Sequence, residues 1–403
     1  MTTPQLAARL RRIKPSPSTF AADRASELRR QGKSIVNLVV GEPDFDTPQH
    51  IRDAAVVAMN QGQTRYTLMA GTVQVREAIV AKLERENHLR YGMDEIIVTS
   101  GAKSAIYSAF AITIETGDEV IIPAPYWVSY PDMVLACDGT PVTVACPESQ
   151  GFKLTAQQLE ASITPRTRWL LINSPSNPTG ASYTLEEYRA LAEVLARHPH
   201  VMVMTDDIYE HIRFDGQRTP HLLEAAPQLR ERTLVVNGVS KTYAMTGWRI
   251  GYIAGPREYI KALDTLLSQS TGSCCGISQA ATAAALNGDQ SFVAESVAVY
   301  KQRRDQTVAA LNQIPGISCR SPEGAFYLYV NCSGLIGRKT PEGKVLQEDT
   351  DVVLYLLESE GVAAVAGTAY GLSPYFRLSI ATSLDILDEG CKRIARAVAK
   401  LTD

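Results

Sequence analysis

Short apolar runs that favour β-strands alternate along this chain with stretches that favour helices. The strand-like runs cover residues 35–40, 96–99, 119–122, 169–173, 201–205, 234–237 and 249–254. Helical patterns between them include residues 75–86, 185–197 and 256–267. This alternation predicts an α/β fold with a mostly parallel sheet between helices. Apolar strands such as residues 201–205 suit burial on both faces of that sheet.

The pattern changes near Phe292, where a long helical stretch begins and continues to Leu311. Strand-like and helical segments then follow at residues 326–330, 352–360 and 375–380. With 403 residues, the chain also exceeds the roughly 250–300 residues at which one core stops growing. We therefore predict a smaller α+β domain at residues 292–403, a large domain at residues 49–291, and an N-terminal segment, residues 1–48, that contributes to the small domain.

Composition excludes several classes of function. The net charge is −3, from 40 Lys and Arg against 43 Asp and Glu, so no overall field favours nucleic acid or an anionic membrane. Seven cysteines without regular spacing are typical of reduced thiols in the cytoplasm. The chain shows neither a secretory signal nor an apolar stretch of about 20 residues that could span a membrane. We expect a cytoplasmic protein with small-molecule partners.

The strongest chemical signal is the segment VNGVSKTYAMTGWRIGY, residues 236–252. It places Lys241 in a turn of small residues after an apolar strand, and Arg249 eight positions later at the expected start of another strand. A buried lysine loses its proton readily and is suited to Schiff-base chemistry with a carbonyl cofactor. Arginine is suited to holding a phosphate. Either residue alone would more often be a solvated loop residue or an ion-pair partner.

Ordered motifs extend over nearly the whole chain: GEPDFDTP from Gly41, RYTLMAG, VTSGAKSA, APYWVSYPD, NSPSNPTG, DDIYEH, SKTYAMTGWRIGY and YFRLSIATS. In these motifs the sequence resembles the fold-type-I, class I aminotransferases that depend on pyridoxal 5'-phosphate, and in particular bacterial aspartate aminotransferases. The resemblance implies an aspartate aminotransferase-like fold with a mostly parallel seven-stranded sheet. It also implies a ping-pong transfer of an amino group between an amino acid and a 2-oxo acid.

The resemblance assigns the cofactor phosphate to Gly101, Ala102 and Lys103, where free amides at a helix N-terminus can bind an anion. Arg249 would hold the same phosphate. Tyr66 would reach the phosphate of a neighbouring subunit, which implies a homodimer with shared active sites.

The rest of the cofactor is assigned to residues around the lysine. Asp206 would keep the pyridine nitrogen protonated, and Tyr209 and Asn177 would hydrogen-bond the phenolic oxygen. Trp127 would stack on the ring, although a tryptophan alone is more often core. Lys241 would remove the α-proton of the substrate and return it to the cofactor as general base and acid.

Substrate residues are implied by the same resemblance. Arg377, on an expected strand, would receive the α-carboxylate with its planar fork. The backbone of Gly41 would approach the same carboxylate, and Trp127 and Asn177 would line the substrate site. No metal is expected, because Asp206 and Asp207, as neighbours in a strand, point to opposite faces.

The amino donor is less constrained by the sequence. Aspartate with 2-oxoglutarate is favoured, and Ser16 and Ser18 could hydrogen-bond a distal carboxylate, although serines in a Pro-rich stretch are more often turn residues. The sequence Ser273-Cys274-Cys275 stands where many relatives have an Asn-Pro pair before the cysteine. Aromatic or other neutral amino acids therefore stay open as donors, as does a lyase that uses the same lysine.

Two further alternatives belong to other classes. Ser100 and Lys103 fit the S-x-x-K pattern of acyl-serine enzymes, but the companion S-D-N and K-T-G motifs are missing. A catalytically silent cofactor-binding protein is disfavoured by the complete set of catalytic residues.

Overall fold

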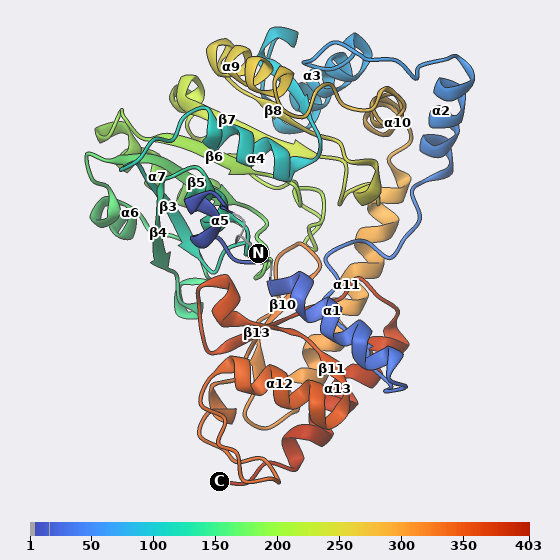
Figure 1. Cartoon of the computed structure of the whole chain (residues 1–403), viewed down its shortest axis with the longest axis vertical. Helices are drawn as coiled ribbons and strands as arrows, with labels where there is room; N and C mark the ends of the chain where they lie inside the picture. Colours follow the sequence, from blue (N-terminus) through green and yellow to red (C-terminus); the bar gives the residue numbers. More distant parts are fainter. Residues whose placement is uncertain (1–4, 16) are drawn as a thin grey trace.

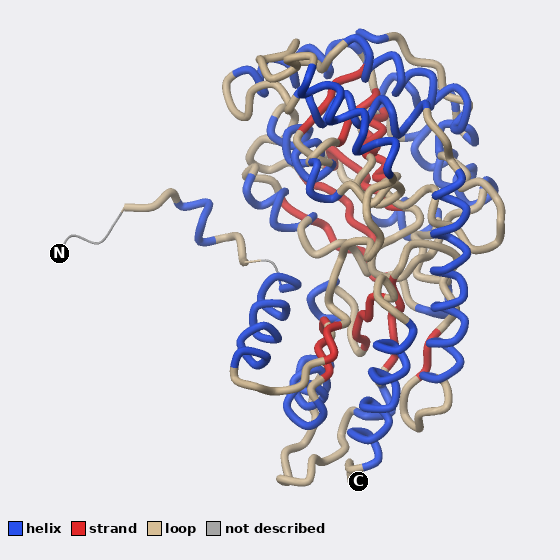
Figure 2. Tube along the Cα trace, turned by 90° about the vertical axis from the view of Figure 1, so that its right-hand side faces the viewer, coloured by secondary structure: helices blue, strands red, loops and turns tan. Residues whose placement is uncertain are grey.

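The computed structural model describes residues 5–15 and 17–403, with side chains outside residues 17–22. The chain forms an upper lobe around a seven-stranded sheet and a lower lobe around smaller sheets (Figure 1). Helix α11 (Ser291–Leu311) runs from the upper lobe into the lower one. Figure 2 shows the strands of the upper lobe enclosed by helices, and residues 5–15 projecting to one side, although Arg12 and Lys14 still hydrogen-bond Asp138 and Asp132 of the upper lobe.

The large sheet has the strand order β2-β8-β7-β6-β5-β3-β4. Only β8 is antiparallel to its neighbours among these strands, so the predicted mostly parallel seven-stranded sheet is confirmed. The strands are β2 (Ile96–Thr99), β3 (Glu119–Ala124), β4 (Thr140–Ala145), β5 (Thr167–Asn173), β6 (Met202–Asp206), β7 (Thr233–Gly238) and β8 (Gly251–Ala254).

The membership of this sheet differs from the sequence prediction at two strands. Residues 35–40 do not join it: β1 (Val36–Asn37) pairs in parallel with β11 (Val362–Ala363). The seventh strand is instead β4, an edge strand in which no residue is fully buried. An edge strand that is partly exposed lacks the continuous apolar run by which the buried strands were recognised.

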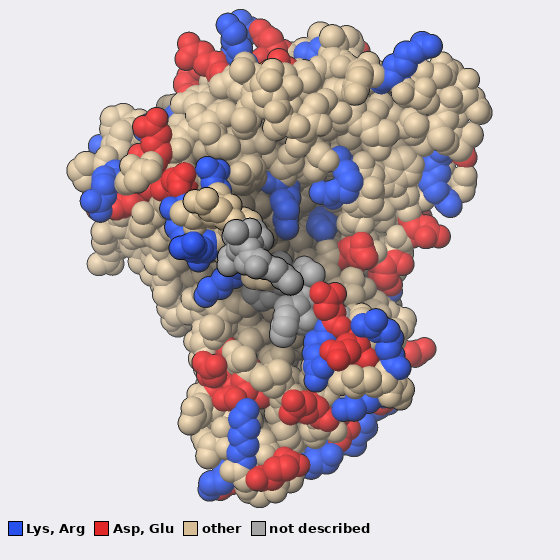
Figure 3. All heavy atoms as spheres, viewed as in Figure 1, with Lys and Arg blue, Asp and Glu red and all other residues tan. Residues whose placement is uncertain are grey.

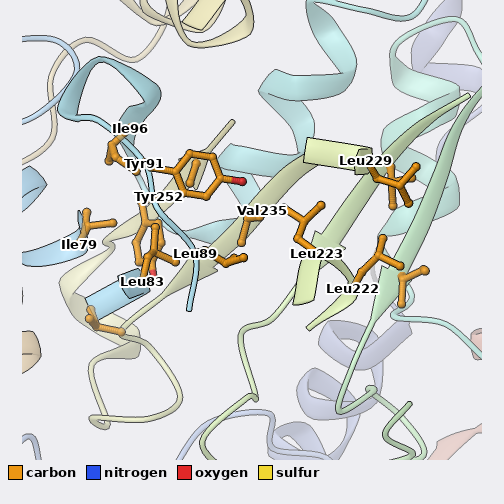
Figure 4. Close-up of a cluster of buried hydrophobic side chains, with 14 of the residues drawn as sticks. Ile79, Leu83, Leu89, Tyr91, Ile96, Leu222, Leu223, Leu229, Val235 and Tyr252 are labelled. Atoms are coloured by element: carbon orange, nitrogen blue, oxygen red, sulfur yellow. The ribbon is translucent and has the colours of Figure 1, made fainter. Parts of the chain in front are cut away.

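Helices cover both faces of the large sheet because alternate residues of its strands point to opposite sides. Ile97 faces one helical layer, whereas Ile96 and Val98 face the other. One layer contains α4 (Ala102–Ala111), α5 (Tyr130–Ala136) and α9 (Arg257–Ser268). The opposite layer contains α3 (Val73–Asn87), α6 (Ala156–Ser162), α7 (Leu185–Arg197), α8 (Leu222–Ala225) and α10 (Gly276–Asn287), and Figure 4 shows part of its core.

The lower lobe contains a four-stranded antiparallel sheet in the order β12-β13-β10-β9. Its strands are β9 (Ser318–Cys319), β10 (Tyr327–Asn331), β12 (Val365–Ala366) and β13 (Tyr375–Ser379), with α12 (Asp349–Glu360) and α13 (Leu384–Ala399). This arrangement confirms the smaller α+β unit. The N-terminal α1 (Pro17–Arg30) contacts β11 and β12. The domain boundaries at residues 48/49 and 291/292 stay a prediction.

The remaining helices lie at connections. Helix α2 (Gln49–Asn60) packs on α10, and short 3-10 helices occur at η1 (Ala8–Arg11), η2 (Met93–Glu95), η3 (Glu148–Gln150), η4 (Pro227–Arg232), η5 (Thr246–Trp248), η6 (Ser333–Leu335) and η7 (Gly367–Tyr370). Among the described residues, no helix combines the length and apolar character that a membrane span requires. All seven cysteines are free thiols.

Candidate active site

A cavity of about 370 Å³ lies where the carboxyl ends of the central parallel strands meet the lower lobe. Asn173 ends β5 and Asp206 ends β6, while Tyr327 and Arg377 come from β10 and β13 of the lower lobe. Figure 3 shows the molecule hollowed between its upper and lower parts, with Lys and Arg atoms inside the hollow. Ligands of open α/β sheets bind at this end of the strands.

Most of the residues singled out in the sequence line this one cavity: Gly41, Ala102, Lys103, Trp127, Asn177, Asp206, Tyr209, Lys241, Arg249 and Arg377. Gly101 adjoins it, next to Arg249. Tyr66 lies elsewhere on the surface, and its side chain is 99% exposed. Gly41 and Arg377 are more than 330 positions apart in the sequence, yet both line the same cavity as Lys241.

Lys241 follows β7 in a turn, and its Nζ donates a hydrogen bond of 2.7 Å to the carbonyl oxygen of Gly41. The pKa of Lys241 is lowered to about 8, chiefly by burial and also by the cations of Arg249 and Arg377, against the opposing effect of the Glu42 and Asp206 carboxylates. A lysine with a pKa of about 8 supplies a free amine near neutral pH, which makes it both a nucleophile and a base.

Asp206 is 4% exposed at the end of β6. Its Oδ2 accepts a hydrogen bond of 2.6 Å from the Tyr130 hydroxyl, and its Oδ1 accepts one of 3.3 Å from the amide of Ile208. Burial raises the pKa of Asp206 to about 6, although the Tyr130 hydrogen bond opposes this rise. A carboxylate in such a place favours a cation opposite it in the cavity.

The neighbouring Asp207 is directed away from this cavity. Its Oδ2 lies 3.1 Å from His221 Nε2 and accepts a hydrogen bond of 3.0 Å from the Thr205 hydroxyl. The Asp206 carboxylate therefore faces the cavity, whereas the Asp207 carboxylate contacts Thr205 and His221. Among the described residues, no group of three or more His, Cys, Asp or Glu side chains is arranged to hold a metal ion.

The start of α4 and Arg249 form the cationic end of the cavity. Gly101 precedes the helix with a φ of 84°, and Arg249 Nη2 donates to the carbonyl oxygen of Ser100 at 3.3 Å. A second bond of 2.9 Å joins Arg249 Nη1 to the carbonyl oxygen of Thr246. Free amides in the first turn of α4 add positive potential to that of the guanidinium.

The expectation that a strand begins at Arg249 was wrong. Arg249 has a φ of 56°, in the left-handed region, and β8 begins at Gly251. The left-handed turn directs the arginine toward α4 instead of into the ladder. Gly251 is needed there because a Cβ at this position would lie 2.4 Å from the amide nitrogen of Ala102.

Lys103 and Trp127 lie together on another wall of the cavity. The ammonium of Lys103 is 4.9 Å from the centroid of the Trp127 ring, a cation–π distance. Burial and the charge of Arg249 lower the pKa of Lys103. Trp127 also meets the ring of Tyr130 edge to face at 5.2 Å. Ser100 does not line the cavity, so the geometry gives no support to an acyl-serine site with Lys103.

Arg377 is 3% exposed on β13. Its Nη1 donates to Asn177 Oδ1 at 3.1 Å and its Nη2 to the carbonyl oxygen of Val39 at 2.7 Å. The guanidinium lies 4.3 Å from the ring centroid of Tyr327. Its Nε is buried and has no hydrogen-bond partner among the described residues. Among the residues that the structure describes, no carboxylate forms an ion pair with this buried cation.

Seven lining residues were not identified from the sequence, and the side chains of three of them hydrogen-bond predicted site residues. Tyr130 bonds Asp206, and Tyr327 shares a 2.9 Å hydroxyl contact with Tyr209. Asn173 accepts from the amide of Asn177 at 2.8 Å and donates to the carbonyl oxygen of Asp206 at 2.7 Å. Tyr130 and Asn173 lie inside motifs that were recognised, so their polar side chains were a usable signal. Tyr327 sits in an apolar strand without such a signal.

Of the two segments considered for donor choice, only residues 273–275 can be placed, and they do not line this cavity. Ser16 and the side chain of Ser18 lie outside the described residues. The Ser273 hydroxyl accepts a 3.3 Å hydrogen bond from the amide of Thr67. Cys274 and Cys275 do not line the cavity. The departure at residues 273–275 is thus adjacent to the exposed Tyr66 segment.

Comparison with known proteins places this geometry in a family. Residues 33–394 match the family described as aminotransferase class I and II. The chain is 53% identical over 400 residues to an aspartate aminotransferase of Rhizobium meliloti (strain 1021), covering 99% of this chain and 97% of that protein. It is 50% identical to an aspartate/prephenate aminotransferase of Cereibacter sphaeroides, covering 98% of each.

Comparison with solved structures leads to the same family. A crystal structure of the aspartate aminotransferase from Rhizobium meliloti has a TM-score of 0.97 at 52% identity, covering 99% of this chain and 100% of the other. The Thermus thermophilus aspartate aminotransferase with maleate has a TM-score of 0.91 at 40% identity, covering 98% and 100%. The chain belongs to the class I and II aminotransferases and is a transaminase with the fold-type-I architecture.

Proposed function

We propose that this transaminase uses pyridoxal 5'-phosphate, held in the cavity around Lys241, to transfer an amino group from aspartate to 2-oxoglutarate. The observation that carries the proposal is the convergence of Lys241, Asp206 and Arg377 on one cavity. When bound, the cofactor supplies an aldehyde that condenses with primary amines and a ring that withdraws electrons from the substrate's Cα.

The residues present fit each part of that cofactor. The phosphate suits the start of α4 together with Arg249, since a side chain at position 101 would collide with this guanidinium. The ring nitrogen suits Asp206, whose buried carboxylate and a protonated nitrogen stabilise each other. Trp127 offers a ring face, while Asn177 and the hydroxyl of Tyr209 offer hydrogen bonds to the phenolic oxygen.

Substrate binding is proposed for the buried arginine. Arg377 is held by Asn177 and the Val39 carbonyl in a fixed orientation, and its buried Nε lacks a partner among the described residues. A carboxylate would supply the missing acceptor and the missing negative charge. The hydrogen bond from Lys241 to the backbone carbonyl of Gly41 supports a carboxylate site beside the amine.

Lys241 performs the proton transfers in this proposal. Its pKa of about 8 leaves a useful fraction of neutral amine near pH 7 to 8. Such an amine can remove the proton from the substrate's Cα, hold it, and return it to a neighbouring carbon. Two half-reactions that share one site predict ping-pong kinetics.

Aspartate is favoured by the relatives. The Rhizobium meliloti relatives are named aspartate aminotransferase, and the Thermus thermophilus structure was solved with maleate, a four-carbon dicarboxylate. A second acceptor is favoured by the Cereibacter sphaeroides relative, whose name also includes prephenate. Prephenate is an oxo acid, so the same chemistry would aminate it. We also propose a homodimer located in the cytoplasm.

The test begins with purified protein and pyridoxal 5'-phosphate. We expect a visible absorbance band, an adduct at Lys241 that survives borohydride reduction and is found by peptide mapping, and a spectral change on adding aspartate without 2-oxoglutarate. Lys241→Ala should keep much of the cofactor affinity while losing roughly 10²–10⁴-fold or more in turnover. Turnover at the normal rate in Lys241→Ala would disprove the proposal.

A donor and acceptor panel then decides the substrates. We expect aspartate to give a stoichiometric 2-oxo acid, with 2-oxoglutarate and prephenate compared as acceptors. Release of ammonia in place of a 2-oxo acid would identify a lyase.

A further inference from the structure

A buried group of charged and amide side chains lies next to the cavity but outside the residues that line it. Its centre is Glu210, which directly follows Tyr209 in the turn after β6. Helix α3 contributes Lys82 and Asn87, on the helical layer opposite α4. Lys82 is only 1% exposed. Lysine is almost never buried so fully unless it is paired.

Both members of the pair at the centre are hydrogen-bonded. Lys82 Nζ donates to Glu210 Oε1 and, at 2.7 Å, to Asn87 Oδ1. Asn87 Nδ2 donates to Glu210 Oε2 at 2.6 Å, which closes a ring of three side chains. Although burial alone would raise it, the Lys82 ammonium lowers the pKa of Glu210 to about 2. Glu210 is therefore a carboxylate at neutral pH.

Two bridges join this group to the turn of the catalytic lysine. Asn237, at the end of β7, donates to Glu210 Oε1 through its side-chain amide. His211 Nδ1 lies 3.2 Å from the hydroxyl of Thr242, the residue that follows Lys241. The bridges therefore attach on both sides of the lysine in the sequence.

The other ring nitrogen of His211 also has a polar partner. His211 Nε2 lies 2.8 Å from Glu86 Oε2 on α3. Glu86 is in turn 3.7 Å from the Lys82 ammonium. The turn after β6, the turn after β7 and α3 are thus connected through polar contacts that a slip of either turn would break.

Stability alone is a weak explanation for such a group. Desolvation of two charges offsets much of their attraction, and apolar side chains of similar volume often stabilise a protein as well or better. A network of directional hydrogen bonds also fixes the positions of the segments that it joins. Placement matters here because a displacement of about 1 Å can cost about 10²-fold in rate.

We infer that the buried Lys82–Glu210 pair positions two turns of the active site relative to each other. One turn carries Tyr209 and the other carries Lys241. The pair thereby sets the spacing between the phenol and the amine that face the cavity. This inference rests on the proposed function, since it concerns the cofactor contacts of those two residues.

Glu210→Gln tests the inference in the holoenzyme. The substitution keeps the size of the side chain and removes its charge. We expect the pH midpoint of the cofactor's visible absorbance to move by about 0.5 unit or more, and kcat to fall by about tenfold or more. In cofactor-free protein, the pH dependence of acetic anhydride labelling at Lys241 should move as well.

Glu119→Gln is the matched control. Glu119 is also a buried carboxylate of the large sheet, bonded to the Thr164 hydroxyl at 2.6 Å and to Arg166, but it lies at the start of β3, away from the cavity. The Glu119→Gln variant should be less stable than the wild type, but the pH midpoint of the cofactor absorbance and the pH dependence of labelling at Lys241 should not change. If both variants behave alike, the pair has a structural role only and the inference is wrong.

Thr242 provides a test that does not depend on the folding of Glu210→Gln. Thr242→Val removes the hydroxyl that meets His211, whereas Thr242→Ser keeps it. We expect Thr242→Val to move the absorbance midpoint in the same direction as Glu210→Gln does. Thr242→Ser should keep the midpoint of the wild-type protein. A midpoint unchanged in Thr242→Val would overturn the inference. Wild-type protein that gives no absorbance band with the cofactor would instead overturn the proposed function.

Discussion

Charges of both signs surround Lys241, and they act on its proton affinity in opposite directions. Burial and the cations of Arg249 and Arg377 lower its pKa, whereas the carboxylates of Glu42 and Asp206 raise it. The resulting pKa of about 8 is a compromise between these groups. Removing any one of them should move the titration of the amine in a direction that its charge predicts.

The first prediction concerns this titration in cofactor-free protein. Only the neutral amine reacts with acetic anhydride, so labelling at Lys241 should rise with pH around a midpoint near 8. Arg249→Gln removes a cation that lowers the pKa of Lys241, so the midpoint should move to higher pH. Arg257→Gln removes an exposed arginine that pairs with Asp94 on the surface and should leave the midpoint in place. Peptide mass spectrometry over a pH series measures all three proteins. A lower midpoint in Arg249→Gln would contradict the prediction.

The second prediction concerns the buried arginine. Arg377→Lys keeps a positive charge but loses the planar fork that is held by Asn177 and Val39. The KM for aspartate should rise by roughly 10- to 150-fold, the range expected for one lost charged hydrogen bond. Steady-state kinetics measure this change, and the cofactor absorbance in the absence of substrate serves as the control. Equal KM values for both proteins would show that the α-carboxylate binds elsewhere.

Among the secondary-structure elements, helix α4 begins directly after a residue, Gly101, whose conformation and surroundings favour glycine. Gly101 combines a φ of 84° with a close approach to Arg249, because a Cβ there would lie 2.3 Å from Nη2. The glycine therefore permits both the sharp entry into the helix and the proximity of the guanidinium. The short loop after β2 thus brings the start of the helix and the guanidinium together, as the proposed anion site requires.

The third prediction follows from this crowding. Gly101→Ala should displace Arg249 and weaken pyridoxal 5'-phosphate binding, and it should cost about 1–3 kcal/mol in unfolding free energy from backbone strain. Gly32→Ala is the control, because Gly32 has a φ of 83° with nothing within 4 Å of its added Cβ. Cofactor titration and urea denaturation separate the two effects. Equal cofactor affinity in both variants would remove the argument for an anion site at α4.

On the scale of the whole molecule, several of the large exposed apolar side chains belong to α2 and to the segment that follows it in the sequence. Val56, Val57, Tyr66, Leu68 and Val73 are all exposed. Large exposed apolar groups close together are typical of surfaces that another protein covers. Because Tyr66 does not line the cavity of its own chain, its proposed role requires a second subunit.

The fourth prediction tests this shared site by complementation. Lys241→Ala and Tyr66→Ala each impair both sites of a homodimer. In a mixed dimer, one site combines Lys241 and Tyr66 of the wild type from different chains, so activity should exceed that of either parent. The measurement uses co-expressed chains with two affinity tags and purification through both. A mixed dimer no more active than its parents, or a monomer by light scattering, would exclude shared sites.

Secondary structure was predictable where burial was two-sided. Residues 201–205 and 234–237 read as apolar strands and became β6 and β7 at the centre of the sheet. The edge strand β4 was missed because its partial exposure leaves no such run, whereas residues 35–40 do form an apolar run but only the two-residue strand β1. Arg249 was misplaced into a strand for a related reason: the left-handed turn that aims it at α4 depends on Gly251 and the start of that helix.

The sequence by itself determined the chemistry and the class of fold. Its motifs singled out Lys241, Asp206 and Arg377, because they resemble those of the class I aminotransferases at these positions. Only the tertiary structure decided how these groups are held. Tyr130 against Asp206, Tyr327 beneath Arg377 and the Lys82–Glu210 pair join segments that are distant in sequence. Such contacts exist only once the chain has folded, since long-range packing sets their distances and burial sets their charges.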